Sequence, residues 1–180
     1  MRRVILVTTA PNIPSISPKP STVPAMKTPD SIDLKILATL QAQGRLTQQA
    51  LSQHVGLSAR ACLDRVRHLE HTGVIEGYMA RINPRKLGSL LTVLVEITLK
   101  DQTQATHQRF EARMRATAEV IECFLVSGNC DYVLRLACRD LDHYRELTAV
   151  WTDDPAFGIE KIASKPELQT IKPFCGYPIG

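Results

Sequence analysis

The chain has 180 residues and a mass of 20.0 kDa, which is enough for one ordinary domain or two small ones. Hydrophobic residues make up 44% and charged residues 22%, a composition typical of soluble globular proteins rather than of disordered chains. No apolar run approaches the ~18 to 20 residues that a membrane-spanning helix needs, which excludes a membrane-spanning protein.

The net charge of +4 is unevenly distributed along the chain. Residues 1–27 carry a net charge of +4 and residues 28–86 a net charge of +3, whereas residues 87–180 carry −3. A basic front and an acidic back suggest two modules, of which the first is suited to a polyanion. Chance is the alternative, because an excess of three charges is small, so charge alone does not decide the function.

Residues 1–27 are expected to be a disordered or mis-started extension outside the fold. The opening MRRVILV resembles the start of a signal peptide, but no clean small-residue cleavage site follows it. Residues 11–25 are rich in Pro and Ser and have no hydrophobic period. Met26 lies just before the first patterned segment, so translation could start at Met1 or at Met26.

Two short helices are predicted next from capping residues and apolar spacing. Asp30 or Ser31 can cap the first helix, which ends before Gly44. Thr47 can cap a second, shorter helix that ends at Gly56. The inward-facing positions share helical spacing and are Ile32, Ile36, Leu37 and Leu40 in the first helix, and Leu51 and Val55 in the second.

A third helix is predicted between Ser58, its cap, and Gly73. The three-residue connection Gly56-Leu57-Ser58 makes the second and third helices a helix-turn-helix, in which Leu57 can fill the angle between them. At ~100° per residue, the apolar and polar residues of the third helix separate onto two faces. The apolar face carries Cys62, Leu63, Val66 and Leu69; the polar face carries Arg60, Asp64, Arg67, His68 and His71, with Arg65 apart from both.

The simplest interpretation of this third helix is a solvated surface helix with its arginines outward. The cap, the glycine turn and the preceding short helix together favour a recognition helix, because major-groove readers present a second helix in this way. Its first turn adds the Ser58 hydroxyl and free backbone N–H groups, which suit phosphates. Double-stranded DNA is therefore the predicted partner.

The segment VIEGYMARI, residues 74–82, predicts a short strand pair, which would be the wing of a winged helix. The sequence thus predicts a winged helix-turn-helix domain over residues 28–82, followed by a hinge over residues 83–89. Three basic residues could contact phosphates or merely solubilise the hinge: Arg81, Arg85 and Lys86.

Residues 90–180 predict a second domain with the element order βαββαβ, the ferredoxin-like split pattern. The predicted strands are residues 90–99, 120–127, 132–138 and 158–164, and the predicted helices are residues 103–115 and 141–151. In such a sheet both helices cover one face. Leu90 and Leu94 add apolar surface to the other face, so we expect it to pair with a second copy of the chain. The expected fold class is α+β.

The chain shows no pattern of a metal site or of a catalytic centre. His68 and His71 are three residues apart, but no further ligand is close in sequence. No carboxylate pair, Ser-His-Asp set or glycine-rich phosphate loop is present, and Cys123 and Cys130 have no obvious histidine partner. We therefore expect no catalytic residues, no metal and no cofactor. Five cysteines without a CxxC pair indicate reduced thiols in a cytoplasm: Cys62, Cys123, Cys130, Cys138 and Cys175.

Several motifs, taken together, resemble the Lrp/AsnC family of bacterial and archaeal transcription regulators. They are GRLTQQALSQHVGLSARACLDRVRHLEHTGVIEGYMARINPRKLG and, some forty residues later, VSGNCDY. The resemblance runs from about Asp30 to Pro178. It implies a winged helix-turn-helix joined by a hinge to a ligand-sensing domain, in a cytoplasmic, nucleoid-associated protein. It also implies homodimers that assemble into octamers and respond to small amino acids or related metabolites.

Carried over to this sequence, the resemblance implies a DNA-binding surface at the second and third helices. Arg65 is expected to hold a phosphate or the fold, because it lies off the polar face, whereas Arg60 and Arg67 should lie nearer the groove. Phosphate contacts would set affinity, and contacts to base edges would set sequence preference. The implied DNA-binding residues are Thr47, Ser58, Arg60, Arg65 and Arg67.

The resemblance also places an effector site at the loop of the VSGNCDY motif, at a subunit interface. Backbone N–H groups around Ser127, Gly128 and Asn129 could bind a carboxylate, and Asp131 could bind an ammonium group. Without the family, this loop would be only a hairpin turn. Asn129-Cys130 fills the variable part of the loop, so the resemblance does not identify the effector.

Three functions follow as hypotheses. The first is a transcriptional regulator gated by an amino acid-like effector, through a population shift between oligomeric states or dimer geometries. The second, an enzyme using the back domain, has no supporting motif. The third is an effector-independent architectural protein that wraps DNA, which differs from the first only in whether the loop binds a ligand.

Overall fold

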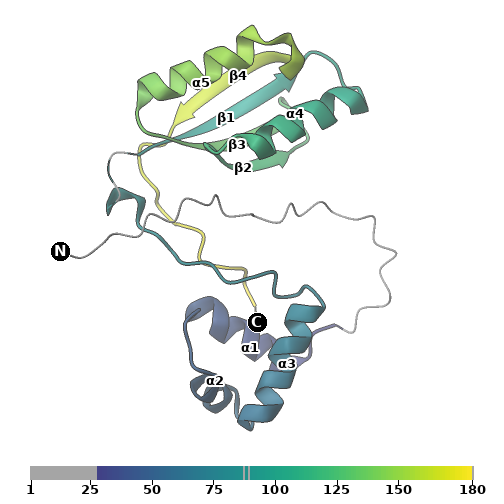
Figure 1. The fold of residues 1–180 in the computed structure, drawn as a ribbon, viewed down its shortest axis with the longest axis vertical. Helices are drawn as coiled ribbons and strands as arrows, with labels where there is room; N and C mark the ends of the chain where they lie inside the picture. The colour runs from purple at the N-terminus through teal and green to yellow at the C-terminus, as the bar shows by residue number, and fades with distance from the viewer. Residues whose placement is uncertain (1–27, 87, 89, 180) are drawn as a thin grey trace, which may run out of the picture. The chain divides into compact units, whose positions relative to one another are not determined.

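The computed structural model describes residues 28–86, 88 and 90–179, which divide into two compact units (Figure 1). The first unit includes the described residues up to Glu76, and the second covers Gly77–Tyr177. The extension predicted for residues 1–27, with its two candidate start sites, lies outside the described residues.

Three helices form the first unit: α1 (Ser31–Ala42), α2 (Gln48–Val55) and α3 (Ala59–His71). Each begins after a predicted capping residue whose side chain accepts backbone N–H groups of the first turn. Asp30 accepts from Ile32 and Asp33 at 2.9 Å each, and Asp33 returns the contact in a capping box. Gly56 ends α2 with φ of 73°, a left-handed conformation that suits glycine and lets the chain turn sharply into α3.

The core of the first unit is a small aliphatic cluster shared by the three helices. Its fully or largely buried members are Ile36, Leu51, Val55, Cys62 and Leu69. Leu57, in the turn between α2 and α3, packs against this cluster as predicted. The apolar faces expected from helical spacing therefore meet in one core, and the polar face of α3 is left exposed.

The strand pair predicted for residues 74–82 is wrong, because this segment has no strand structure. Val74 and Ile75 pack against the core of the first unit, and the Ile75 N–H donates to the Leu69 carbonyl at 3.0 Å. From Glu76 onward the side chains are exposed, with Met79 at 94%. A two-stranded hairpin is marginal unless one face is buried, and no such face exists here. A short 3₁₀ turn, Pro84–Lys86, follows.

The second unit is a four-stranded antiparallel sheet with two α-helices (Figure 1). Its elements in chain order are β1 (Leu91–Leu99), α4 (Gln104–Ala116), β2 (Val120–Leu125), β3 (Tyr132–Cys138), α5 (Leu141–Asp153), a 3₁₀ turn (Pro155–Phe157) and β4 (Ile159–Pro166). The strand order is β2-β3-β1-β4, which places the two halves of the βαββαβ pattern side by side. The predicted α+β ferredoxin-like arrangement is confirmed.

Alternate residues of the central strands point to the helices. The buried residues of the two strands are Val93, Val95, Ile97 and Leu99 of β1 and Tyr132, Leu134, Leu136 and Cys138 of β3. They pack against four buried side chains of the helices: Phe110, Met114, Tyr144 and Trp151. Within the described residues, no helix packs on the opposite face of the sheet. On that face Leu94 lies beside Arg135 in the sheet register, and Phe124 lies beside Val133.

Two strand ends differ from the prediction by two residues, and β1 and β4 each start one residue later than predicted. β2 stops at Leu125 rather than Ser127, because the Val126 N–H donates across the hairpin to the Asp131 carbonyl at 2.9 Å and closes the loop there. β4 continues past Ser164 to Pro166, since an edge strand can hold a proline without losing a ladder hydrogen bond. Among the residues described, no helix has the length and apolar character needed to cross a membrane.

Candidate functional site

The exposed face of α3 carries a row of basic and imidazole side chains. Arg60, Arg67, His68 and His71 are all exposed. The Arg60 Nε donates to Asp64 Oδ2 at 3.1 Å, a solvated pair that leaves the other guanidinium N–H groups free. Arg67 forms no ion pair within the part of the chain that the structure describes. Both arginines can therefore reach an external anion.

The caps of α2 and α3 add uncharged donors beside this face. The Thr47 and Ser58 hydroxyl oxygens accept backbone N–H groups of Ala50 and Ala61 at 3.2 and 3.3 Å. Each hydroxyl accepts in its capping role, so its own proton remains available for a phosphate oxygen. The Gln48 side chain donates to the Ala59 carbonyl at 2.9 Å and ties the start of α2 to the start of α3.

Arg65 has a different environment from Arg60 and Arg67. Its Nη1 donates to Asp30 Oδ2 and to Asp33 Oδ1 at 2.7 Å each, which joins the middle of α3 to the start of α1. The Asp33 N–H and Arg65 stabilise the charged carboxylate and hold the pKa of Asp30 below its usual value. These contacts support the fold-holding role for Arg65, and a DNA contact by Arg65 stays a prediction.

The loop between β2 and β3 presents backbone donors to solvent. Ser127, Gly128 and Asn129 are exposed, and their N–H groups have no acceptor within the described residues. Gly128 has φ of 133°, a conformation that residues with a side chain rarely adopt, and it lets the loop turn between the strands. The arrangement leaves adjacent N–H groups free for an anion such as a carboxylate.

Asp131, at the end of this loop, is half-buried and already has two partners. Its Oδ2 accepts the Leu99 N–H at 2.7 Å, and its Oδ1 accepts Gln102 Nε2 at 2.9 Å. The Asp131 N–H donates to the Ile97 carbonyl at 2.8 Å, so the residue is anchored to the end of β1 from both its backbone and its side chain. A carboxylate has about four acceptor positions, so Asp131 can still accept from a ligand.

The sequence interpretation missed the residues that hold Asp131. Gln102 comes from the connection after β1, and behind it lies His107 of α4, whose Nε2 is 3.1 Å from Gln102 Oε1. His107 Nδ1 is 2.7 Å from the Tyr132 hydroxyl, and that hydroxyl donates to Glu111 at 3.2 Å. Burial and the nearby Glu111 raise the pKa of Tyr132. No local motif marks these residues, because only the packing of α4 on β3 brings them together.

The cysteines give no sign of an activated nucleophile. All five lie within the described residues and are unpaired. Burial and the Glu111 charge raise the pKa of Cys123 to about 11, so this thiol stays protonated at neutral pH. Within the described ranges, no three His, Cys, Asp or Glu side chains are grouped so that they could hold a metal ion.

An open groove of about 330 Å³ lies along α5 and β4. Its lining is mainly hydroxyl-bearing and small side chains, and none belongs to the loop around Asp131: Tyr144, Arg145, Thr148, Ala149, Thr152, Ile162 and Ser164. The Thr148 and Thr152 hydroxyls donate to carbonyls of their own helix, and Tyr144 bonds to Ser164. The groove therefore offers few unused polar groups.

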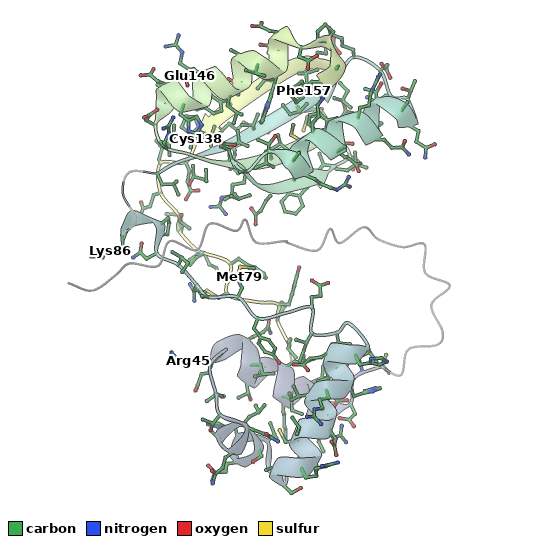
Figure 2. The ribbon with its side chains drawn as sticks, viewed as in Figure 1. Arg45, Met79, Lys86, Cys138, Glu146 and Phe157 are labelled. Atoms are coloured by element: carbon green, nitrogen blue, oxygen red, sulfur yellow. The ribbon has the colours of Figure 1, made fainter. Side chains whose placement is uncertain are left out.

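Figure 2 shows Glu146 of α5 and Phe157, which follows this helix, among the side chains of the second unit.

Comparison with known protein families gives two matches that together cover most of the chain. Residues 29–76 match the family described as winged helix-turn-helix DNA-binding, and residues 92–173 match the Lrp/AsnC ligand binding domain. The first match covers the three helices, and the second covers the sheet with α4 and α5.

Similar proteins give the same result. The chain is 46% identical over 118 residues to a leucine-responsive regulatory protein of Haemophilus influenzae, covering 66% of this chain and 71% of that protein. It is 44% identical to the leucine-responsive regulatory protein of Escherichia coli K12, covering 66% and 72%.

Solved structures of regulators have the same fold. A transcriptional regulator from Neisseria meningitidis, in complex with L-Met, matches with a TM-score of 0.77 and 30% identity, covering 83% of this chain and 96% of that one. A feast or famine regulatory protein from Mycobacterium tuberculosis, complexed with L-methionine, matches with a TM-score of 0.72 and 33% identity, covering 84% and 99%.

Proposed function

The chain belongs to the Lrp/AsnC family and is a DNA-binding transcriptional regulator; we propose that an amino acid or a related small metabolite sets its affinity for DNA. One observation carries the proposal: free backbone N–H groups at Ser127, Gly128 and Asn129 lie in the same loop as the anchored carboxylate of Asp131. An amino acid zwitterion offers a carboxylate to the first set and an ammonium group to the second. Two relatives of this fold have been solved with L-methionine, which supports this chemistry.

The proposed DNA contacts are divided by type. Arg60 and Arg67 reach the major groove, where arginine reads guanine edges, and the hydroxyls of Thr47 and Ser58 bind phosphates. Arg65 holds α3 to the start of α1 through its ion pairs with Asp30 and Asp33. In this division base contacts set sequence preference, whereas phosphate contacts set affinity and its dependence on salt.

The proposed division of labour follows the predicted domains. Residues 28–82 bind DNA, residues 83–89 are a hinge, and residues 90–180 bind the effector and form the oligomer. The uncovered face of the sheet, with Leu94 and Phe124 on it, pairs with a second copy, and dimers assemble further into an octamer. An effector that binds one oligomeric state more tightly than another shifts the population toward it, and DNA binding follows.

The relatives are transcription regulators, and we infer that this chain likewise acts by binding rather than by catalysis, in the cytoplasm and in association with the nucleoid. The raised pKa of Cys123 and the satisfied hydroxyls along α5 support this inference, because neither supplies an activated nucleophile.

A thermal-shift screen of the full chain against the twenty standard amino acids tests the effector site. A ligand at ~100 times its dissociation constant stabilises the folded state by about 2.7 kcal/mol, which raises the melting temperature by several degrees. Asp131→Ala should remove the shift, because the ammonium group loses its counter-charge. Asp142→Ala, which removes an exposed carboxylate at the start of α5, is the matched control and should leave the shift intact.

Two outcomes would contradict the proposal. A shift that persists at full size in Asp131→Ala would move the site away from this loop. No shift with any amino acid or with common 2-oxo acids, in a protein that still binds DNA, would favour the architectural, effector-independent protein.

A further inference from the structure

Four contacts at hydrogen-bonding distance join Glu111 of α4 to the carboxylate of Asp131 through three intermediate side chains. Glu111 Oε1 lies 3.2 Å from the Tyr132 hydroxyl, which lies 2.7 Å from His107 Nδ1. His107 Nε2 lies 3.1 Å from Gln102 Oε1, and Gln102 Nε2 lies 2.9 Å from Asp131 Oδ1. Tyr132, within this series of contacts, is only 1% exposed, so packing fixes the position of its side chain.

The proton positions along this series of contacts can be followed from the Asp131 carboxylate. An ionised carboxylate only accepts, so Gln102 must direct its NH₂ group to Asp131 and its oxygen to His107. That oxygen only accepts, so His107 Nε2 carries a proton. In neutral His107 the other nitrogen, Nδ1, then accepts the single Tyr132 hydroxyl proton, so the hydroxyl has no proton left for Glu111. In charged His107 both nitrogens donate, and the Tyr132 proton turns to Glu111 instead.

We propose that Gln102 and His107 are positioning residues of the effector site, and that protonation of His107 weakens the binding of an effector ammonium group at Asp131. The inference rests on the proposed function of Asp131. Gln102 holds the carboxylate oxygen in place, and His107 holds Gln102. A positive charge on His107, one side chain away from the carboxylate, repels the ammonium group that Asp131 attracts.

Several titratable and charged groups lie around His107. Glu111, on the same helix, is paired with Arg115 at 2.7 Å. Tyr132 of β3 contacts the ring directly, with ring centroids 5.6 Å apart. Asp131 acts through Gln102, and Cys123 of β2 stays an uncharged thiol beside Tyr132.

Calorimetric titration of the full chain with each of the twenty standard amino acids, at pH 8.0 and pH 5.5, tests the proposal. The wild type should bind its tightest amino acid several-fold more weakly at the lower pH. Gln102→Ala should raise the dissociation constant roughly tenfold at both pH values, since a charge-assisted hydrogen bond that orients Asp131 is lost. His107→Gln, which keeps a donor and acceptor but cannot charge, should bind with no such pH dependence.

The matched control is Gln108→Ala, which removes an exposed amide from the same helix without touching the chain of hydrogen bonds. It should bind as the wild type does at both pH values. Calorimetry measures binding of the amino acid itself and is independent of the two further histidines, His68 and His71, that lie on the exposed face of α3.

The outcomes separate this inference from the proposed function. If Asp131→Ala abolishes binding while Gln102→Ala binds as the wild type, the positioning role is wrong and the effector site stands. If His107→Gln retains the full pH dependence, the proton effect is wrong. If no amino acid binds the wild type, both fail.

A second readout needs no ligand. Nitrogen chemical shifts of the neutral His107 ring should place its proton on Nε2, because only that nitrogen can donate to Gln102 Oε1. A neutral ring protonated at Nδ1 would contradict the contact by which His107 holds Gln102.

Discussion

Two arginines on α3, Arg65 and Arg67, are two residues apart and have opposite surroundings. Arg67 is exposed, whereas Arg65 bridges two carboxylates at the start of α1. A helix turns about 200° over two residues, so neighbouring arginines face different environments. At the scale of single residues, the same side chain is therefore exposed to solvent at one position and joins two helices at the other.

The bridge at Arg65 makes the first unit sensitive to acid. The pKa of Asp30 is lowered in the folded protein, so its contribution to the free energy of unfolding is present above its ordinary value of 3.8 and is lost as the pH falls below it. Asp30→Asn keeps the helix cap but removes this contribution. The melting temperature of the variant, followed by circular dichroism, should fall less steeply than that of the wild type below about pH 4.

Asp64→Asn is the control for that experiment, because Asp64 pairs with the exposed Arg60 and its pair is solvated. Its acid profile should follow the wild type. A wild-type profile for Asp30→Asn would show that the bridge to Arg65 adds nothing to stability.

At the scale of elements, Gly158 joins the 3₁₀ turn after α5 to β4, and its position is strained for any residue with a side chain. Its φ is 65°, and an added Cβ would lie 2.8 Å from the Thr106 Cγ2 on α4. Gly158→Ala should lower the free energy of unfolding by about 2 to 4 kcal/mol, from the left-handed backbone and the overlap together. Chemical denaturation of the second unit measures the change.

The double variant Gly158→Ala with Thr106→Ser separates the two causes. Serine lacks the methyl group that the new Cβ meets, so the double variant should recover the part of the loss that comes from overlap, and only the backbone cost should remain. No recovery would mean that the packing between α4 and this turn is not what excludes a side chain.

Most helices and strands could be predicted from the sequence because their signals are local. Asp30, Thr47 and Ser58 cap helices at the positions that their side chains favour, and β3 has the predicted bounds Tyr132–Cys138. The prediction of a strand pair over residues 74–82 was wrong, because a strand needs a neighbouring backbone to pair with. A run of residues that favour strands does not supply that partner. The residues there match a strand pattern without forming a strand.

The candidate site was predictable only in part. The loop residues Ser127 to Asn129 and Asp131 could be identified from a motif, because they are consecutive. The supporting residues Gln102 and His107 could not, since they reach Asp131 only after α4 has packed on the sheet. Likewise, the helical spacing of ~100° per residue places Arg65 off the polar face. Nothing in the local sequence indicates that Asp30 and Asp33 are its partners.

At the scale of the whole molecule, the proposed pairing with a second copy depends on the uncovered face of the sheet. Leu94 is 40% exposed and Phe124 is 54% exposed, and both lie on this face by strand register. A lysine at position 94 adds a positive charge between its basic cross-strand neighbours Arg135 and Lys165, and this charge is costly to bury against a second copy. Leu94→Lys should therefore reduce the oligomer to smaller species without unfolding the chain, as measured by light scattering after gel filtration.

Leu141→Lys is the matched control, because Leu141 is 55% exposed at the start of α5 and lies off the sheet face. It should leave the mass of the oligomer unchanged. If Leu94→Lys also leaves it unchanged, the uncovered face is not an assembly surface.

In the proposed mechanism, DNA binding through α3 responds to a small molecule bound at the loop around Asp131. The most direct test is fluorescence anisotropy on a duplex selected by the wild-type chain from random sequence, with and without the amino acid that gives the largest thermal shift. The wild type should change affinity by about 5- to 150-fold, the usual range of allosteric coupling. Asp131→Ala should bind the duplex without responding, and Arg60→Ala with Arg67→Ala should bind weakly under both conditions. An effector response of wild-type size in Asp131→Ala, or unchanged DNA affinity in the double arginine variant, would contradict the account.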